Sequence, residues 1–201
     1  TITAPVVPLA LGTSIQISVP FTDADVTESK PYTATIDWGD GSTSSSSFTD
    51  VGTITGSKTY AVSGIYVVSV TIRQDNFQDH FDAKTVEGYV VVYDAKNGFV
   101  TGGGWINSPA GAYTANPSLT GKANFGFVSK YQNGATQPTG NTEFQFQAGN
   151  FNFKSTLYDW LVISGGFKAQ YKGSGTVNGQ PGYSFMLTAI DGGAKGGGAP
   201  D

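Results

Sequence analysis

Apolar and polar residues alternate along much of the chain, and a period of two is typical of half-buried β-strands. In the first half, the segments Ile15 to Phe21, Ala34 to Trp38 and Tyr66 to Ile72 follow this pattern. The segment Gly88 to Tyr93 is instead apolar on both faces at its centre. This pattern predicts a strand that is either sandwiched or passes between two domains.

The second half of the chain carries the same signal. Alternation is strict in Glu143 to Gln147, and pairs such as Gly165-Gly166 and Asn178-Gly179 mark turns between the apolar runs. The strand candidates are Ala123 to Lys130, Thr142 to Gln147, Asn150 to Lys154, Trp160 to Ser164, Phe167 to Gly173 and Tyr183 to Ala189. No segment combines a helical period of 3.6 with a capping residue. The pattern therefore predicts an all-β chain with antiparallel strands in both halves.

A polar break at Asp94 to Gly98 is the best boundary candidate. It predicts one domain over residues 1–94 and a second over 95–201, joined by a linker short enough to restrict their relative motion. The last residues, Asp191 to Asp201, are rich in glycine and carry no strand signal. We expect them to form a mobile loop or linker.

Composition narrows the possible partners. The chain has a net charge of −4, and its single arginine, Arg73, and scattered lysines form no basic cluster, which excludes nucleic acid as a partner. No apolar run approaches the ~20 residues that cross a bilayer, so we expect no membrane insertion. The absence of cysteine excludes disulfides and thiolate sites. An acidic, cysteine-free chain rich in Gly, Ser and Thr favours an extracellular or cell-surface protein of bacterial or archaeal origin.

Catalytic chemistry has little support in the sequence. There is no Gly-x-Ser-x-Gly elbow, His-Glu-x-x-His motif or phosphate loop. The only histidine, His80, lies between Asp79 and Asp82 at irregular spacing, and a surface position explains it more simply than a metal site. Glutamate occurs only three times, and nothing marks two carboxylates as facing a cleft. We therefore predict that the chain is not an enzyme.

A set of spaced motifs in the first half points to a known domain type. The motifs are Phe21-Thr22-Asp23, Ala34 to Ser42, Lys58-Thr59-Tyr60 and Ser63 to Ile72. Together they resemble a polycystic-kidney-disease (PKD) domain over about residues 5–94. The resemblance implies a seven-stranded immunoglobulin-like sandwich, found in extracellular surface proteins and secreted hydrolases as a spacer or ligand-binding accessory domain. It does not imply an enzyme.

The central motif Trp38-Gly39-Asp40-Gly41 has two interpretations. In the structural one, Trp38 fills the core, Asp40 and Gly41 close a turn, and Tyr60 and Tyr66 belong to the same structural motif. In the other, Asp40 contributes to a ligand site.

Calcium is the best metal hypothesis, because Ca²⁺ prefers carboxylate and carbonyl oxygens on loops. The candidate ligands are Asp23, Asp25 and Asp75, on two loops that converge in PKD-like domains known to bind calcium. Gln74 stands where an acidic residue is common in those domains, which weakens the case. The alternative is a solvated acidic loop end.

The second half resembles a domain that follows PKD or other immunoglobulin-like repeats in bacterial surface proteins. The matching segments are Gly98 to Ile106, Ser108 to Tyr113 and Gly121 to Tyr131. This resemblance implies architecture and context, but no activity. Members of that family continue past the position of Pro200-Asp201 into further strand sequence. If the same holds here, a sheet edge is left open to a partner strand.

Aromatic residues of the second half have two interpretations. The aromatic candidates for stacking on sugar rings are Trp105, Tyr113 and Tyr131, together with Tyr158, Trp160 and Tyr171. The amides available to read hydroxyl groups are Asn124, Gln132, Gln145 and Gln147. The alternative is that these aromatics build a core.

We therefore predict a noncatalytic structural or adhesive module pair that binds protein or carbohydrate at the cell surface. One alternative is a self-assembling subunit of a surface filament or layer, in which an open sheet edge accepts a strand; the alternating segment Thr1 to Val7 motivates it. Another is an accessory carbohydrate-binding domain of a secreted hydrolase.

Overall fold

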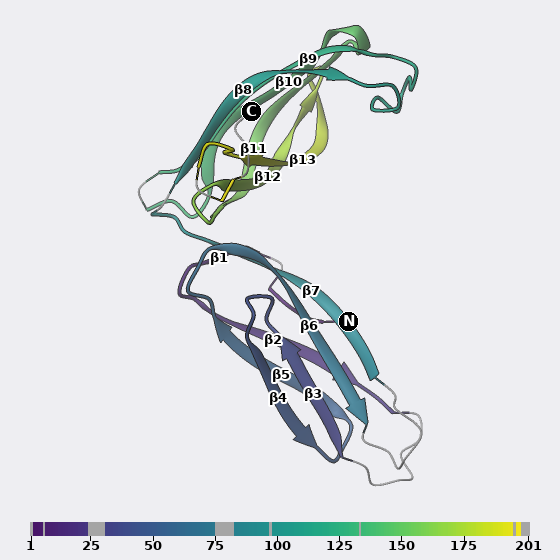
Figure 1. Ribbon diagram of the computed structural model, residues 1–201, viewed down its shortest axis with the longest axis vertical. Coiled ribbons are helices and arrows are strands. Elements are labelled where there is room, and N and C mark those ends of the chain that lie inside the picture. The colour runs from purple at the N-terminus through teal and green to yellow at the C-terminus, as the bar shows by residue number, and fades with distance from the viewer. Residues whose placement is uncertain are drawn as a thin grey trace. The chain divides into compact units, whose positions relative to one another are not determined.

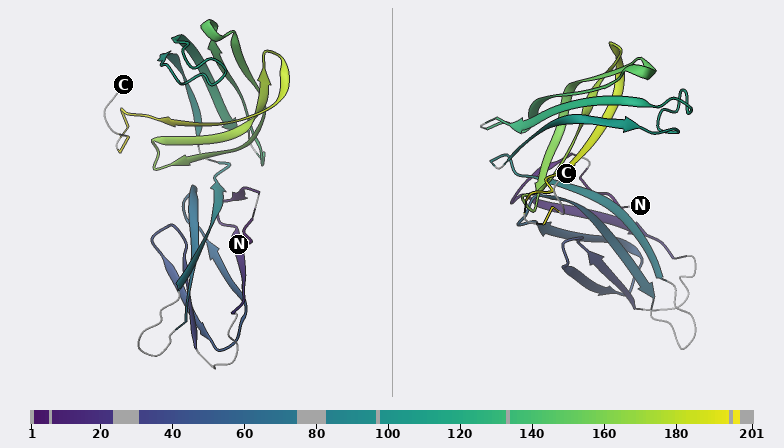
Figure 2. Two further views of the ribbon diagram at one scale, coloured as in Figure 1. Left: turned by 90° about the vertical axis from the view of Figure 1, so that its right-hand side faces the viewer. Right: turned by 45° about the horizontal axis from the view of Figure 1, so that its top comes forward.

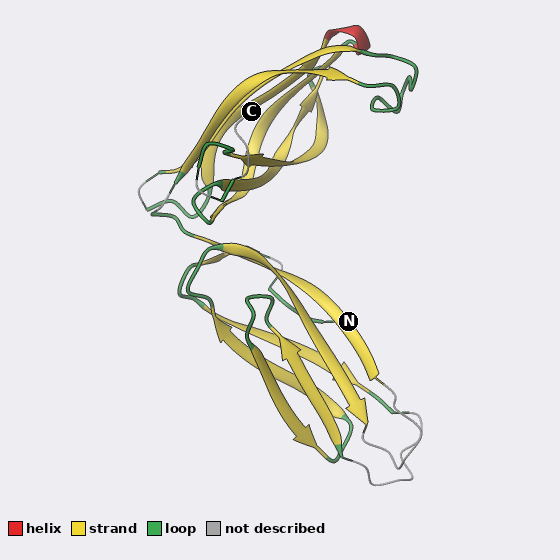
Figure 3. Cartoon of the chain, viewed as in Figure 1, coloured by secondary structure: helices red, strands yellow, loops and turns green. Residues whose placement is uncertain are grey.

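The computed structural model describes residues 2–5, 7–23, 31–74, 83–96, 98–132, 134–194 and 196–197. The chain divides into two compact units, unit 1 (Thr1–Val92) and unit 2 (Tyr93–Asp201). The described residues form strands joined by turns, with one short 3₁₀ helix, η1 (Gln147–Gly149), as Figures 1, 2 and 3 show. The prediction of an all-β fold is confirmed.

Unit 1 is a β-sandwich of two sheets (Figure 1). One sheet has the strand order β1-β7-β6-β3-β4, and the other pairs β2 with β5. The strands are β1 (Leu9–Ala10), β2 (Ser14–Phe21), β3 (Tyr32–Asp37), β4 (Thr43–Phe48), β5 (Gly52–Thr59), β6 (Gly64–Gln74) and β7 (Ala83–Tyr93). Non-consecutive strands are neighbours in both sheets, so this unit depends on pairing between distant parts of the chain.

Alternating residues of facing strands build the core of unit 1. Ile15 and Ile17 from β2 are buried in the same apolar cluster as Val68 and Val70 from β6. Each strand places every second side chain inward, so the period of two in the sequence becomes one buried layer. Trp38 and Tyr60 are fully buried in this cluster.

The N-terminal segment belongs to unit 1. Ile2 is buried in its core, and Thr3 and Ser18 exchange backbone hydrogen bonds of 2.8 and 3.0 Å. These residues therefore already have partners within their own chain.

Unit 2 is one six-stranded antiparallel sheet in which every strand pairs with its neighbours in sequence, in the order β13-β12-β11-β10-β9-β8. The strands are β8 (Phe99–Ser108), β9 (Gly121–Tyr131), β10 (Pro138–Phe146), β11 (Phe151–Ser164), β12 (Lys168–Val177) and β13 (Gln180–Ile190). The sheet curls strongly, so that its first and last strands flank one concave face (Figure 2). Val100 of β8 and Leu187 of β13 both pack against the buried cluster on that face.

Two irregularities in β11 bend the sheet. Its register against β12 shifts between Ser155 and Leu157 and again between Tyr158 and Trp160. A β-bulge bends its strand and increases the local twist. Gly173 of β12 accommodates the bulged backbone, because a Cβ there would collide with the carbonyl oxygen of Leu157. The two bulges also explain why the separate strands expected at Asn150 to Lys154 and at Trp160 to Ser164 are one continuous strand.

Candidate functional site

The carboxylate of Asp40 is engaged by its own turn. Its Oδ1 accepts hydrogen bonds from the backbone N–H and the hydroxyl of Ser42, at 3.0 and 2.5 Å. Its Oδ2 lies 2.7 Å from Lys58 Nζ. Burial acts to raise the pKa of Asp40, but the hydrogen bonds from Lys58 and Ser42 outweigh it and lower the pKa to about 2. These contacts support the structural interpretation of Asp40.

Backbone geometry explains the glycines of the same motif. Gly39 and Gly41 have φ angles of +74° and +86°, which residues with a Cβ rarely adopt. A Cβ on Gly39 would also lie 2.5 Å from the carbonyl oxygen of Val67. Tyr60 stacks on Tyr66 with ring centroids 3.9 Å apart, and its hydroxyl donates a 2.7 Å hydrogen bond to the Trp38 carbonyl. The motif thus closes one end of the core.

The calcium hypothesis is only partly within the described residues. Asp23 accepts a 2.6 Å hydrogen bond from the hydroxyl of Tyr32. Asp25 and Asp75 lie outside the described residues, as does His80. Among the residues that the structure describes, no group of three or more His, Cys, Asp or Glu side chains is placed to hold a metal ion. The calcium site stays a prediction.

Two of the aromatic candidates for sugar binding, Tyr131 and Tyr113, are partly buried against other residues of unit 2. Tyr131 stacks on Tyr93 at 5.0 Å, and its hydroxyl bonds to both the N–H and the C=O of Leu161, at 3.0 and 3.2 Å. Burial raises the pKa of Tyr131 to about 12. Tyr113 contacts the ring of Phe146 edge-on at 5.8 Å. Both side chains therefore stabilise the sheet.

Trp105 differs from these two tyrosines. Its side chain is 57% exposed on the edge strand β8. It points away from the concave face, because it alternates with Gly104, which lies against the ring of Phe125 on that face. The three candidate residues do not form one site.

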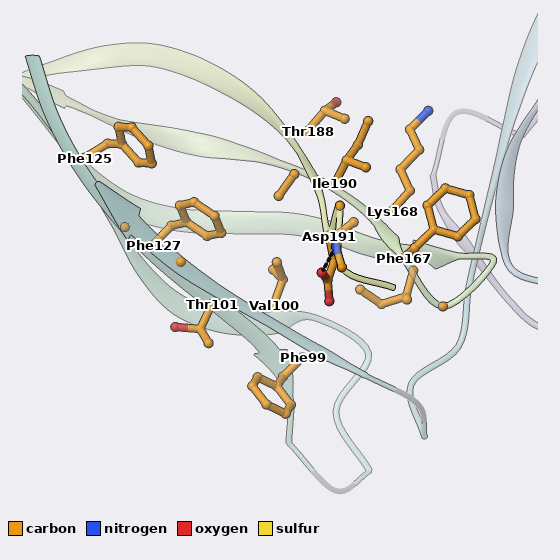
Figure 4. A pocket seen from close by; sticks show the side chains of 18 residues that line it. Phe99, Val100, Thr101, Phe125, Phe127, Phe167, Lys168, Thr188, Ile190 and Asp191 are labelled. Carbon is orange, nitrogen blue, oxygen red and sulfur yellow. Dashed lines mark hydrogen bonds between the residues drawn. The ribbon is translucent and has the colours of Figure 1, made fainter. Parts of the chain in front are cut away.

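The site that the fold builds is a groove of about 890 Å³ between β8 and β13, on the concave face of unit 2. Figure 4 shows Phe125 and Phe127 on one side of it and Thr188 and Ile190 on the other. Sequence reasoning did not find this groove. Its only signal was the alternation of aromatic residues along Ala123 to Tyr131 opposite a glycine run.

Both walls of the groove are free sheet edges. β8 pairs only with β9, and β13 pairs only with β12, among the strands that the structure describes. An edge strand presents unpaired backbone N–H and C=O groups on its outer side, and these can bond to another strand. The groove is therefore bordered by backbone donors and acceptors.

The floor of the groove is formed by two phenylalanine rings of β9. They can lie over the neighbouring strand β8 because the residues of β8 in register with them are glycines. A Cβ on Gly102 would lie 2.6 Å from Cζ of Phe127, and one on Gly104 would lie 3.4 Å from the ring of Phe125. Phe127 also contacts Tyr171 at a centroid distance of 6.3 Å. The two glycines thus allow the phenylalanine rings to cover the inner side of the edge strand.

Next to this floor, on the same face of the sheet, lies a buried cluster of hydroxyl groups. Thr142 Oγ1 is 2.8 Å from the hydroxyl of Tyr158 and 2.9 Å from that of Tyr171. Ser155 Oγ is 3.0 Å from the Tyr158 hydroxyl and accepts a 2.8 Å bond from the Thr142 N–H. Burial raises the pKa of Tyr171 to about 12, an increase that its hydrogen bond with Thr142 partly offsets. The cluster therefore joins four side chains from three neighbouring strands, β10, β11 and β12.

Charge in the groove is balanced. Lys168 and Asp191 are the charged residues among those that line it. Asp191 Oδ1 accepts a 3.0 Å bond from the Gly193 N–H. The remaining lining side chains are apolar or hydroxyl-bearing, so this arrangement can bind an uncharged extended segment.

No protein-family model matches the sequence, and no match among curated proteins was found. In the described part of the chain, no helix has the length and apolar character needed to cross a membrane.

Proposed function

We propose that the chain is a noncatalytic extracellular binding module in which the groove of unit 2 accepts an extended polypeptide strand from a partner. The observation that carries this proposal is the pair of free sheet edges, β8 and β13, on either side of an aromatic floor. Unit 1 would act as a spacer, in keeping with its resemblance to PKD domains.

Strand addition uses both parts of this arrangement. The backbone of an incoming strand bonds to a free edge, which supplies affinity, while every second side chain points onto the floor, which supplies specificity. The rings of Phe125 and Phe127 favour apolar side chains at these inward positions. Because Lys168 and Asp191 balance, we expect an uncharged strand of alternating apolar and polar residues.

The strand is not the folded chain's own N-terminal segment. Thr1 to Val7 has a suitable alternation, but Ile2 is buried in the core of unit 1 and Thr3 pairs with Ser18. Association of β8 in one copy with β13 in the next is the self-assembling alternative. Such head-to-tail contacts give filaments when the rotation between copies does not close a ring.

A short peptide of alternating threonine and valine, flanked by lysines, tests the proposal as a labelled probe. We expect it to bind and to protect backbone amides of β8 or β13 from hydrogen exchange. Val100→Lys places a charge on the concave face and should abolish binding. Asn107→Lys, on the opposite face of the same strand and outside the residues that line the groove, is the matched control and should leave binding unchanged.

Three results would contradict strand addition: no protection of either edge strand, protection elsewhere in unit 2, or equal loss of binding in both lysine variants. Light scattering after size exclusion identifies the source of the strand. A chain that polymerises without the peptide, and stops doing so in Val100→Lys, would favour self-assembly over a separate partner.

A further inference from the structure

The outer face of the unit 2 sheet carries a straight row of one aromatic and three amide side chains. Trp105 of β8 is in register with Asn124 of β9, Asn124 with Gln145 of β10, and Gln145 with Asn152 of β11. Residues in register on antiparallel neighbours point to the same side of a sheet. These four residues, here named the Trp–amide row, span three inter-strand spacings of ~4.8 Å, or about 14 Å.

The side chains of this row are available to a ligand. Trp105 is 57% exposed. In the described part of the chain, the side-chain amides of Asn124, Gln145 and Asn152 make no hydrogen bonds to protein. Each amide offers two N–H donors and a carbonyl acceptor. The row therefore combines one apolar ring with a line of unused donors and acceptors.

A flat strip lies beside the row. On the same face, Gly103 of β8 is in register with Gly126 of β9. A Cβ built on Gly126 meets nothing within 4 Å, so the space above it is open. Two adjacent residues without side chains leave bare backbone next to the Trp105 ring. A flat, ring-shaped ligand can lie there against the face or edge of the indole.

Two lysines lie on this face, at opposite ends of β9, although the chain as a whole carries a net charge of −4. Lys122 Nζ lies 4.7 Å from the centroid of the Trp105 ring, and Lys130 projects from the same side of β9. Neither lysine forms an ion pair within the described residues. The negative charge of Glu143 on β10 is balanced by Lys154 on β11: Lys154 Nζ lies 3.5 Å from Glu143 Oε1. The unpaired cation beside the aromatic ring is therefore Lys122, because Lys130 lies eight residues further along β9.

We propose that this face binds an acidic polysaccharide, a chain of uronic-acid rings. The indole of Trp105 presents its electron-rich face to the C–H groups of a pyranose ring. Lys122 is placed to pair with the carboxylate of that sugar, and the amides are placed to bond its hydroxyl groups. This site lies on the opposite face of the sheet from the groove, so it is independent of the proposed strand binding.

Affinity electrophoresis of the full chain in gels containing polygalacturonate tests the proposal, with dextran as the neutral comparison. We expect retardation by polygalacturonate alone. Trp105→Ala should weaken binding by about tenfold or more, the loss typical of a central aromatic contact. Lys122→Gln should weaken it by about threefold and make it less sensitive to salt, because one exposed charge pair is removed.

Gly126→Val provides a test that does not depend on removing a contact. The open space above Gly126 admits a valine, and valine favours strands, so the melting temperature should stay the same or rise. The added side chain nevertheless fills the strip, and binding should be lost. Tyr183→Ala, which removes a 46% exposed aromatic from β13, is the control and should bind like the unaltered chain.

Each of the following results would overturn the proposal: no retardation by polygalacturonate, equal retardation by dextran, or unaltered binding in Gly126→Val. The two proposed sites can fail separately. Val100→Lys should retain polygalacturonate binding while it loses the strand peptide, and Trp105→Ala should show the reverse.

Discussion

Removal of one buried hydroxyl gives the sharpest test of how unit 2 is held together. Thr142 is 5% exposed, and its hydroxyl bonds to those of Tyr158 and Tyr171. Thr142→Val keeps the shape of the side chain and deletes the shared oxygen. Tyr158 retains its 3.0 Å bond to Ser155, whereas Tyr171 loses the hydrogen-bond partner that its hydroxyl has within the described residues.

The magnitude follows from these contacts. A neutral hydrogen bond contributes about 1 kcal/mol net, and a buried polar group left unsatisfied costs about 1–3 kcal/mol. We therefore expect Thr142→Val to lower the free energy of unfolding of unit 2 by about 2–3 kcal/mol. Tyr171→Phe should cost only about 1 kcal/mol, because Thr142 keeps Tyr158 as a partner. The double variant, Thr142→Val with Tyr171→Phe, leaves no unsatisfied hydroxyl at position 171. Its loss of unfolding free energy should therefore be about 1 kcal/mol smaller than the sum of the two single losses.

Hydrogen exchange of native protein, read by mass spectrometry on peptides from β10, β11 and β12, measures the opening free energy of unit 2 separately from unit 1. If the two units unfold independently, substitutions in unit 1 leave the opening free energy measured on these unit 2 peptides unchanged. A loss below about 0.5 kcal/mol in Thr142→Val, or additive single and double variants, would refute the view that the hydroxyl cluster acts as one network.

Three further predictions concern unit 1. Tyr60→Phe deletes the buried bond to the Trp38 carbonyl and should cost about 1–2 kcal/mol in urea unfolding; an unchanged midpoint would contradict this. The pKa of Asp40 is lowered from an ordinary 3.8 to about 2 in the folded chain. The ionised carboxylate therefore contributes its full stabilisation of the folded state above about pH 4, and this contribution is lost as the pH falls through 2. Lys58→Met should flatten this dependence of melting temperature on pH, and an equally steep curve would count against the ion pair. Calcium should raise the melting temperature of the chain but not of Asp23→Ala, and a melting temperature insensitive to EDTA would remove the calcium hypothesis.

Strand positions could be predicted from the sequence because burial on one face leaves a period of two. Ile15 and Ile17 show this in unit 1, and Phe144 and Phe146 show it in unit 2. The continuity of β11 could not be predicted in this way. Its bulges insert extra residues that break the alternation, so one bent strand has the same pattern as two short ones.

The role of each aromatic residue was harder to predict. Trp105 and Tyr131 stand in similar alternating contexts, yet one is exposed and the other is stacked and hydrogen-bonded inside the sheet. A ring suits a core as well as a sugar, and only the tertiary partner decides between them. The groove could not be predicted from the sequence either. It exists because the sheet curls far enough for β8 and β13 to line the same hollow, and the sequence pattern does not encode this curvature.

The neighbour-to-neighbour order of unit 2 has a consequence for how the chain folds. Its strands pair only with the strands before and after them, whereas unit 1 must join β2 to β5 and β3 to β6. Short loops close at a smaller entropic cost, and chains with low contact order fold faster. The β12–β13 hairpin turns through Asn178 and Gly179, both at positive φ, a conformation suited to early nucleation. Unit 2 should therefore assemble by successive hairpins, ahead of the unit that precedes it in the sequence.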